Sequence, residues 1–545
     1  QIAAPGAIAK KGSAPGGDIR VIFDGTNGVY LNLGIRIRDQ VRFPTSCDIR
    51  AVLTELAAEG GVHWSLLFDV SKAHRRIPVL EEEWGRQACQ IRGTAAATAG
   101  LRRRASEVSV RGGVRRAAPL KRADFSPAEL REFVYVNCVG TFGVTSAGYW
   151  WGRAGGSIMR LAHYFIGYVD AVWSLLYSDD GKITGRTQNP ERGILLHLLV
   201  LVIIRLPLSW KKVRGGTEVE WIGYLVDVGR FELGITAARA AWINRWLTDK
   251  VAEGRMQLGE LKEGLGRIGF AAGPVEHLRP FLGPLYAWAS AGPRYARPKL
   301  PLMILLIMKY IAAEILDFHM VPCESRTRDL GEVFRLDAKA DKNEVAIGGW
   351  RVKGNSGARN AEWFAVSLTR ANAPWAFARG ESFRTIASLE LLGALVGMMV
   401  LVPEGTYRGE LTGLITLSCG TDNQSNSYLL DKMLTTKYPL GVVLMELAHQ
   451  MRRRRLVLRA QWLPRLQNDE ADQLTNMDFR HFDKKKRIPV DLDRLGFQVL
   501  PELFEAGEAY LETLNKLKAD SKSEGIERAK KRLRGDRGLK ESDPW

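Results

Sequence analysis

The sequence has few cysteines, and their spacing fits neither a metal site nor a disulfide framework. The five cysteines among the 545 residues are Cys47, Cys89, Cys138, Cys323 and Cys419, and no CxxC pair occurs. Zinc sites and disulfide-rich domains are usually recognised by closely spaced cysteine pairs. The scattered cysteines therefore argue against both classes and indicate a reducing compartment.

The sequence also lacks an apolar run long enough to cross a bilayer. Its longest apolar stretches, Ile194–Ile204 and Pro301–Leu316, fall short of the roughly 20 apolar residues that a spanning helix needs. We expect Ile194–Ile204 to be a buried helix. Pro301–Leu316 is interrupted by Lys309 and falls in a region with a helical pattern. No signal-peptide pattern is present, and the chain begins with Gln1. We expect an intracellular protein, cytoplasmic or nuclear, that is neither secreted nor in contact with a membrane, and a piece of a longer product.

Acidic residues are fewer than basic ones. The chain has 60 Asp and Glu against 78 Lys and Arg, which gives a formal net charge of +18 at pH 7. Such a charge favours a polyanionic partner, and nucleic acid more than a membrane surface; a charge that serves only solubility is the alternative. The apolar content of 46% and the charged content of 25% are ordinary, and the length predicts roughly two to four domains.

The residue pattern predicts a mixed α+β and α/β protein with several domains. Strand-like runs alternate with helices before residue 228, helical periodicity dominates 230–326, and a βββαβα-like order follows to about residue 478. Gly, Ala and Pro at the start predict a flexible lead-in, and the charged end predicts a helix and a disordered tail. The predicted segments are 1–17, 18–228, 229–331, 332–478 and 479–545.

Three carboxylates in the first half are placed as metal ligands would be. Trp173–Ile183 predicts a β-hairpin with Asp179 and Asp180 at its tip. Adjacent carboxylates repel each other unless a cation intervenes, and Mg²⁺ prefers such oxygen ligands. Asp69 ends an apolar strand, where an ionised carboxylate is costly without a cation. If the strands share a sheet, the three acids converge and suit two-metal phosphoryl transfer. The alternative is an exposed acidic turn.

Five stretches, in the same order, resemble the palm motifs of retroelement (retrotransposon-type) reverse transcriptases. Phe68–Val79 (FDVSKAHRRIPV) resembles the first motif, and Thr141–Ala147 resembles their Phe-Gly-Leu-x-Ser-Ala motif. Tyr177–Asp180 resembles the Tyr-x-Asp-Asp box, and Leu208–Lys212 and Trp221–Tyr224 resemble the two motifs that follow. The resemblance implies a right-hand polymerase, with fingers and palm before residue 228 and a helical thumb and connection after it.

The same resemblance implies roles for individual residues. Asp69, Asp179 and Asp180 would hold two Mg²⁺ ions, or Mn²⁺ in their place. His74 falls where these polymerases place an aromatic residue that rejects the 2′-hydroxyl of a ribonucleotide; a half-buried histidine at a strand end is the alternative. The other implied substrate contacts are Arg20 (or else a solvated strand arginine), Lys72, Phe142 and Gly143 in the nucleotide pocket, and Lys211 and Lys212 on phosphate groups.

Four acids in the second half resemble a ribonuclease H fused to such polymerases. Asp337 lies in a strand, Glu390 in an apolar helix, Asp422 at a strand end and Asp472 in an Ala-Asp-x-Leu-Thr sequence. Four such acids can hold two Mg²⁺ ions around a scissile phosphate; the alternative is that each is a cap or a surface residue. Asp469 is the rival to Asp472. Where many relatives carry a histidine, the loop before Asp472 has Pro464-Arg465-Leu466.

These patterns predict an RNA-directed DNA polymerase with a ribonuclease H. Its expected partners are an RNA template, a DNA primer, an RNA–DNA hybrid and dNTPs. The basic stretch Arg102–Arg122 is a candidate phosphate contact, and Lys484–Arg487 could bind nucleic acid or act as a nuclear signal. The alternatives are a catalytically inactive RNA-binding scaffold that keeps both folds, and an RNA-directed RNA polymerase, which His74 leaves open.

Overall fold

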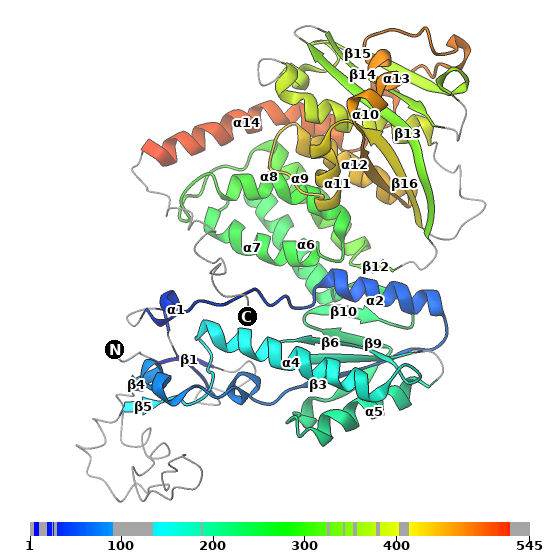
Figure 1. The fold of residues 1–545 in the computed structure, drawn as a ribbon. Coiled ribbons are helices and arrows are strands. Elements are labelled where there is room, and N and C mark those ends of the chain that lie inside the picture. The colour runs from blue at the N-terminus through cyan, green and yellow to red at the C-terminus, as the bar shows by residue number, and fades with distance from the viewer. Residues whose placement is uncertain are drawn as a thin grey trace, which may run out of the picture. The chain divides into compact units, whose positions relative to one another are not determined.

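The structure, a computed structural model, describes residues 5–9, 19–23, 25–26, 30–90, 134–186, 189–323, 327–341, 344–352, 357–377, 382–402 and 414–523. The chain forms two compact units, whose elements are labelled in Figure 1. Of the described residues, the first unit holds those up to Pro44 and Trp64–Gly216, and the second holds Thr45–His63 and those from Thr217 onward. The basic stretch Arg102–Arg122 lies outside the described residues.

A four-stranded antiparallel sheet forms the centre of the first unit. Its strands, in pairing order, are β6 (Val172–Tyr177), β7 (Asp180–Gly185), β3 (Trp64–Asp69) and β8 (Arg214–Gly216). The helices α4 (Thr145–Ile166) and α5 (Pro190–Ile203) pack against it, and Phe68, Trp151 and Ile194 share one apolar core. The predicted hairpin and the strand that ends at Asp69 are confirmed. The helix around Ile194 is present, but the expectation that it is buried is wrong for one of its faces. Leu195, Leu199 and Ile203 are exposed at 63%, 51% and 68%, because only the opposite face packs on the sheet.

The first unit also contains two small antiparallel pairs and a short α-helix, besides the 3-10 helices Ala73–Arg76, Glu81–Gln87 and Trp210–Lys212. The pairs and the α-helix are β1 (Pro5–Ala9) with β2 (Ile19–Phe23), β4 (Ala88–Gln90) with β5 (Val134–Val136), and α1 (Leu31–Gly34). β1 lies in the segment that we expected to be a flexible lead-in. Its backbone pairs with β2. The Gly-, Ala- and Pro-rich composition did not predict this strand, because the pairing depends on β2.

Helices dominate the first part of the second unit. They are α2 (Ser46–Glu59), α6 (Ala237–Glu253), α7 (Leu258–Ala271), α8 (Arg279–Ala289) and α9 (Leu302–Asp317), the last of which confirms the helix expected in 301–316. A four-stranded sheet accompanies them, in the order β12 (Met320–Pro322), β11 (Glu232–Gly234), β10 (Tyr224–Asp227) and β9 (Glu218–Trp221). The region expected to be helical therefore also contains two short strands, β11 and β12.

A five-stranded mixed sheet forms the second part of this unit. Its order is β15 (Trp363–Leu368), β14 (Glu344–Arg351), β13 (Thr327–Asp341), β16 (Leu414–Thr421) and β17 (Leu456–Trp462), with β16 parallel to β13 and to β17. The accompanying helices are α10 (Ile386–Leu401), α11 (Gln424–Lys432), α12 (Leu440–Arg454) and α13 (Asp469–Thr475).

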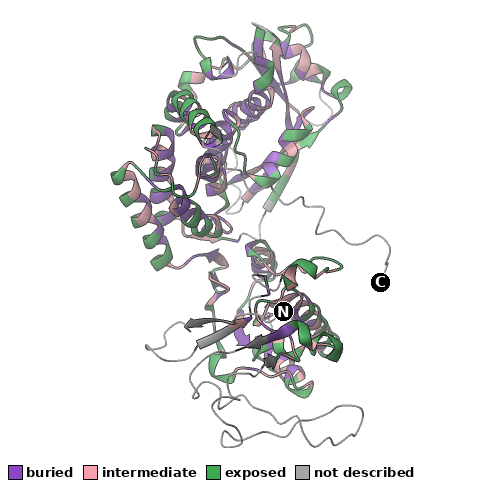
Figure 2. Cartoon of the chain, turned by 90° about the vertical axis from the view of Figure 1, so that its left-hand side faces the viewer, coloured by how far each residue is buried: buried purple, intermediate pink, exposed green. Residues whose placement is uncertain are grey.

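The apolar helix α10 packs on the central strand β13 because two of its glycines leave room for side chains of the sheet. A Cβ atom at Gly397 would lie 2.7 Å from the Phe334 ring, and one at Gly393 would touch Leu336 at 3.4 Å. Buried residues, purple in Figure 2, gather where helices and sheets meet. This close approach positions α10, and with it Glu390, against β13.

Residues after 478 pack along the edge strand β15. The backbone N–H of Ile488 donates to the carbonyl of Trp363 at 2.8 Å, and the Trp363 indole N–H donates to the carbonyl of Asp483 at 2.9 Å. The Arg487 guanidinium lies over the rings of Trp363 and Phe479. Arg487, the last residue of the basic run Lys484–Arg487, therefore packs against aromatic rings of the fold.

The helix α14 (Leu500–Ser523) follows this edge segment. The fully buried carboxylate of Glu446 accepts hydrogen bonds from the backbone N–H groups of Val499 and Leu500, at 2.7 and 2.9 Å. Orphan N–H groups at a helix start need such acceptors. The tail that we expected to be partly disordered therefore has a described structure as far as Ser523.

Among the described residues, one stretch has the length and composition of a membrane-spanning helix, contrary to the expectation that no such run is present; it was missed because Glu390 interrupts its apolar residues. It is Ser382–Leu401, which contains α10, with a mean hydropathy of 1.6 over its most apolar window. Of that window, 78% is buried inside the fold. A buried core helix has the same properties, so the stretch is weak evidence for a membrane.

Candidate active sites

The first carboxylate cluster forms where β3 meets the hairpin of β6 and β7. Asp69 lies opposite Asp180 in the antiparallel register, and the backbone carbonyl of Asp179 accepts a hydrogen bond of 2.8 Å from the N–H of Val70. The three acids therefore come from strand ends that are hydrogen-bonded to each other. The strand ends meet as the sequence predicted, and the metal-binding role of the three acids stays a prediction.

Local packing fixes the hairpin turn. Ser178 has a left-handed backbone with φ of 53°, a conformation that costs a non-glycine residue about 1 kcal/mol or more. Its carbonyl accepts a hydrogen bond of 2.8 Å from the indole N–H of Trp151 on α4. Gly181 follows the acids, and a Cβ atom there would lie 2.0 Å from the Phe68 ring. The buried Phe68 ring thus supports the hairpin from below the carboxylates.

Asp69 is buried and has a cationic partner. Its Oδ2 accepts a hydrogen bond of 2.7 Å from Lys212 Nζ. The backbone explains this contact, because the N–H of Ser209 donates to the carbonyl of Asp69 at 2.8 Å and so brings the Leu208–Lys212 stretch beside the acid. Lys212, which the sequence placed on a substrate phosphate, therefore lies within contact of the carboxylate cluster.

The carboxylates perturb each other. Partial burial raises the pKa of Asp180, and the negative charges of Asp179 and Asp69 add to the rise. Lys212 and Arg214 oppose it. Like charges that share a site disfavour full ionisation, and a divalent cation would remove the conflict. The donors of this cluster are all oxygen atoms, the ligands that Mg²⁺ prefers. Among the described residues, however, only one group of three acids, Asp337, Glu390 and Asp422, has oxygen atoms that all lie within 4.8 Å of one another.

Three of the predicted substrate-binding residues lie together next to β2. The centroids of the His74 and Phe142 rings are 5.0 Å apart with an edge-to-face angle of 81°. Gly143 has φ of 97°, and a Cβ atom there would lie 1.7 Å from the Phe23 carbonyl oxygen, so only glycine fits. Asn32, which sequence reasoning missed, holds this turn by donating to the Gly143 carbonyl at 2.8 Å.

Lys72, Lys211 and Arg20 are not brought into one site within the described part of the chain. Lys72, at the start of a short 3-10 helix, and Lys211 are exposed. Arg20 belongs to β2, and its side chain lies outside the described part of the chain. Their roles stay predictions.

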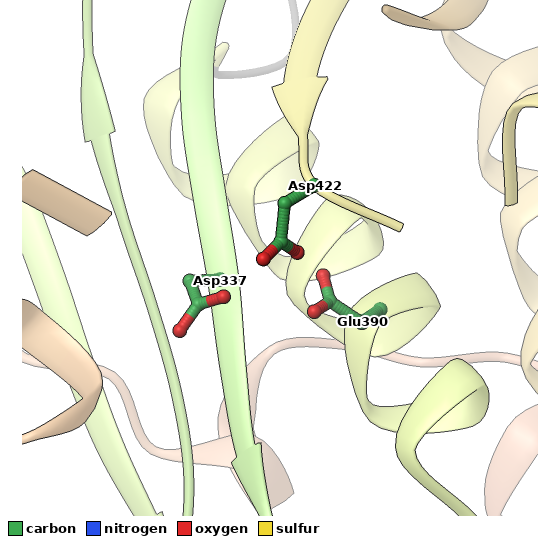
Figure 3. Close-up of side chains that lie close together, drawn as sticks. All are labelled: Asp337, Glu390 and Asp422. Atoms are coloured by element: carbon green, nitrogen blue, oxygen red, sulfur yellow. The ribbon is translucent and has the colours of Figure 1, made fainter. Parts of the chain in front are cut away.

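The second carboxylate cluster joins three elements of the five-stranded sheet region. Asp337 on β13, Glu390 on α10 and Asp422 just after β16 each offer an oxygen atom, and these atoms lie within 4.8 Å of one another. Figure 3 shows the three carboxylates directed into one space. Asp337 and Glu390 are buried, at 6% and 3% exposure. Three acids at such distances fit a hard divalent cation such as Mg²⁺.

Burial and mutual repulsion disfavour the ionised forms of these acids when no cation is bound. Burial raises the pKa of Asp337 to about 6, and the charges of Asp422 and Asp472 add to the rise. Burial, followed by the charges of Asp337 and Asp422, raises the pKa of Glu390 well above its usual range. The hydroxyl groups of two threonines, which sequence reasoning did not assign, stabilise the ionised forms: Thr475 donates to Asp337 at 2.8 Å, and Thr421 donates to Glu390 at 3.2 Å.

The fourth predicted acid lies in the same pocket but outside the triad. The pocket has a volume of about 490 Å³, and Asp472 lines it together with the triad, whereas Asp469 is not among its lining residues. The Asp472 carboxylate accepts hydrogen bonds from Arg465 at 2.7 Å and from the Asn476 amide at 2.8 Å. Arg465 is the residue that stands in the loop where a histidine was expected. Its contact with Asp472 could not be read from the sequence.

Comparison with known proteins gives a limited result. No protein-family model matches the chain, and no curated protein matches it. Three similar solved structures are of a foamy viral protease–reverse transcriptase: a form named dRH with double-stranded DNA, a complex with an RNA/DNA hybrid and a complex with double-stranded DNA. Their identities are 14%, 14% and 13%, and their TM-scores are 0.40, 0.39 and 0.40.

The matches cover 84%, 84% and 85% of this chain, and the chain spans 65%, 50% and 78% of those chains, in the same order. Similarity at this level supports no argument about function. The function proposed below therefore rests on the geometry of the two carboxylate clusters.

Proposed function

We propose that the chain is an RNA-directed DNA polymerase that also carries a ribonuclease H, in a right-hand arrangement of fingers, palm and thumb with a ribonuclease H-like domain. The observation that supports this most directly is that acids gather in each compact unit. Asp69, Asp179 and Asp180 lie at adjacent strand ends in the first unit. In the second unit, Asp337, Glu390 and Asp422 have oxygen atoms within 4.8 Å of one another and line one pocket with Asp472. Two clusters suit two separate phosphate chemistries on one nucleic acid.

The first cluster would extend a DNA primer. Asp69, Asp179 and Asp180 would hold Mg²⁺ ions, which supply charge that favours the deprotonated primer 3′-hydroxyl and offsets the leaving pyrophosphate. Lys212 Nζ lies 2.7 Å from Asp69 Oδ2 and places a positive charge beside that buried carboxylate. The exposed Lys211 beside it would attract the triphosphate of a dNTP. His74, Phe142 and Gly143 would form the wall against which the sugar and base are placed.

The second cluster would hydrolyse the RNA strand of an RNA–DNA hybrid. Asp337, Glu390, Asp422 and Asp472 would hold the metal ions, with Thr475 and Thr421 keeping two of the acids in place. An RNA template, a DNA primer, dNTPs and the hybrid product are the substrates in this proposal. The net charge of +18 is suited to a backbone-directed, salt-sensitive grip on them. An intracellular location, cytoplasmic or nuclear, belongs to the same proposal.

Primer extension on an RNA template tests the first site. We expect the Asp179→Ala, Asp180→Ala double variant to lose dNTP incorporation by at least about 10³-fold, because the loss of two ligands removes the metal positions. The matched control is Glu81→Ala, Glu82→Ala, which removes two exposed acids of the same unit. Equal synthesis by the double variant and the intact protein would exclude the polymerase assignment.

Cleavage of an RNA–DNA hybrid tests the second site in the same preparations. We expect Asp422→Asn to abolish RNA cleavage while it leaves primer extension within about twofold, because its carboxylate belongs to the second cluster alone. Persistent cleavage would show that the ribonuclease site is placed wrongly. An intact protein that binds hybrid but neither extends nor cleaves it would instead favour the scaffold.

His74 gives one reason to retain a second candidate, an RNA-directed RNA polymerase. The ring is partly buried and packs edge-on against Phe142, and its buried Nδ1 has no partner among the described residues. The primer-extension assay with rNTPs in place of dNTPs separates the two. Preferential use of rNTPs by the intact protein would favour the RNA polymerase.

A further inference from the structure

Arg465 is placed to act on the second cluster, although neither the sequence nor the proposed reaction assigned it a role. It begins a short 3-10 helix, Arg465–Gln467, after β17. Its Nη2 donates to Asp472 Oδ1 at 2.7 Å, and its side chain is 76% exposed while that of Asp472 is 31% exposed. The guanidinium therefore reaches the carboxylate from the open side of the pocket.

The backbone that carries Arg465 is tied to the two strands that carry acids. The carbonyl of Gln467 accepts a hydrogen bond of 2.7 Å from Arg335 on β13, and the amide of Asn468 donates to the Leu336 carbonyl at 2.9 Å. The N–H of Leu463 donates to the carbonyl of Thr421, the last residue of β16, at 2.9 Å. These contacts fix the loop, so a change of partner by Arg465 needs only rotation of its own side chain.

The charges in the pocket distinguish Arg465 from the other cation there. Lys339 also lines the pocket, but its Nζ donates to the exposed Glu344 at 2.7 Å. Arg465 is bound to an acid that itself lines the pocket. As long as that ion pair persists, the carboxylate of Asp472 is partly neutralised and is a poorer ligand for a divalent cation.

We propose that Arg465 is a positioning residue with two successive partners. In the absence of metal it holds Asp472. When Asp472 turns to a divalent cation, the released guanidinium binds a phosphate of the RNA strand next to the scissile bond. This inference rests on the proposed ribonuclease H and deepens it. The planar guanidinium suits both partners, because carboxylate and phosphate each accept two parallel N–H bonds from it, which a lysine cannot donate.

Metal binding without nucleic acid tests the first partner. The full chain carrying Asp179→Ala and Asp180→Ala, which removes the first cluster, is titrated with Mn²⁺ by calorimetry. Added Arg465→Gln should tighten Mn²⁺ binding by about threefold, the size expected for breaking an exposed ion pair. Arg459→Gln is the matched control, because it removes the same charge from an exposed position on β17 outside the pocket. Arg465→Lys should lie between the two.

Hybrid cleavage tests the second partner, in chains whose first cluster is intact. Arg465→Gln should raise the KM for hybrid several-fold at saturating Mg²⁺ and reduce the salt dependence of binding by about one phosphate contact, with kcat changed less than KM. Arg465→Lys should restore part of the KM but not all of it, since it keeps the charge and loses the paired donors.

The inference is overturned if Arg465→Gln and Arg459→Gln bind Mn²⁺ equally, or if the KM for hybrid is unchanged in Arg465→Gln. Failure of the proposed function looks different. In that case the intact protein does not cleave hybrid, and Asp422→Asn binds Mn²⁺ as the parent does. Unfolding of Arg465→Gln would be seen by circular dichroism, and Arg465→Lys, which keeps the cation, then carries the test.

Discussion

At the scale of single residues, the acids of the second cluster are buried where their ionisation is unfavourable. Asp337 and Glu390 are buried beside each other and beside Asp422, and each has one hydroxyl donor, from Thr475 and Thr421. Because the folded state raises the pKa of Asp337 from 3.8 to about 6, it binds more protons than the unfolded chain between these values. Metal-free stability therefore falls as the pH rises through this window.

Replacing Asp337 should reveal this cost. In EDTA at pH 8, we expect Asp337→Asn to increase the free energy of unfolding of the second unit by up to roughly 3 kcal/mol, the equivalent of the rise in the pKa of Asp337 from 3.8 to about 6. The asparagine still accepts the hydrogen bond from Thr475 but carries no charge. Chemical denaturation of both proteins measures the difference. Asp341→Asn, at the exposed end of β13, is the control and should change stability little.

The advantage of Asp337→Asn should vanish below about pH 4, where the wild-type carboxyl group is also neutral in both states. Saturating Mg²⁺ should reverse the order of stability, because the intact cluster gains binding energy that the variant lacks. A variant that is less stable than the wild type in EDTA at pH 8 would contradict the account of a repulsive cluster.

The grouping of Asp337, Glu390 and Asp422 could be predicted from the sequence, but the partners of the acids could not. Asp69, Asp179, Asp180 and the later acids follow strand ends or interrupt apolar runs, where an isolated charge is too costly to be incidental. The contacts of Lys212 with Asp69 and of Arg465 with Asp472 depend on side-chain conformations. Long flexible side chains have many reachable partners, so spacing along the chain does not select among them.

At the scale of elements, the hairpin of β6 and β7 depends on the space left by Gly181. The ring of Phe68 on the neighbouring strand β3 occupies the position that a side chain at residue 181 would need. This packing makes the position of the carboxylates depend on a core contact directly beneath them. The hairpin is thus a rigid platform for Asp179 and Asp180.

We expect Gly181→Ala to destabilise the first unit by about 1–3 kcal/mol and to reduce primer extension, because the buried ring must move. Denaturation and primer extension measure the two effects. Gly34→Ala is the control, since a Cβ atom there meets nothing within 4 Å. Phe68→Leu should offset part of the loss, so that the double variant loses less than the two single variants together. Additive losses would argue against the contact.

Elements with strong local patterns were predictable, and those made by distant pairing were not. Alternation and apolar runs marked β3, the hairpin and α9. β11 and β12 were missed because each has three residues and is stabilised by its partner strand rather than by its own composition. The same reason applies to β1, which is stabilised by its pairing with β2 rather than by its own composition.

At the scale of the whole molecule, the chain has two units with separate cores. Phe68 and Trp151 belong to the core of the first unit, and Trp350 and Leu474 belong to a core in the second. Each carboxylate cluster lies within one unit. Separate cores commonly unfold as separate cooperative steps.

Calorimetry should therefore resolve two unfolding transitions. We expect Gly181→Ala to lower one melting temperature and Asp337→Asn, in EDTA at pH 8, to raise the other, because the two positions belong to different units. The wild-type protein under the same conditions is the reference. A single transition that both substitutions move would mean that the units unfold together.

The segment that packs along β15 affects how the nuclease region can be isolated. A boundary drawn at residue 478, where the recognisable motifs end, would remove the backbone partner of Trp363 and uncover its ring, which Arg487 and Phe482 contact. A bare strand edge is a template for other chains, so the excised piece would tend to self-associate. A fragment that extends to Ser523 keeps this edge closed and retains α14 on the Glu446 carboxylate.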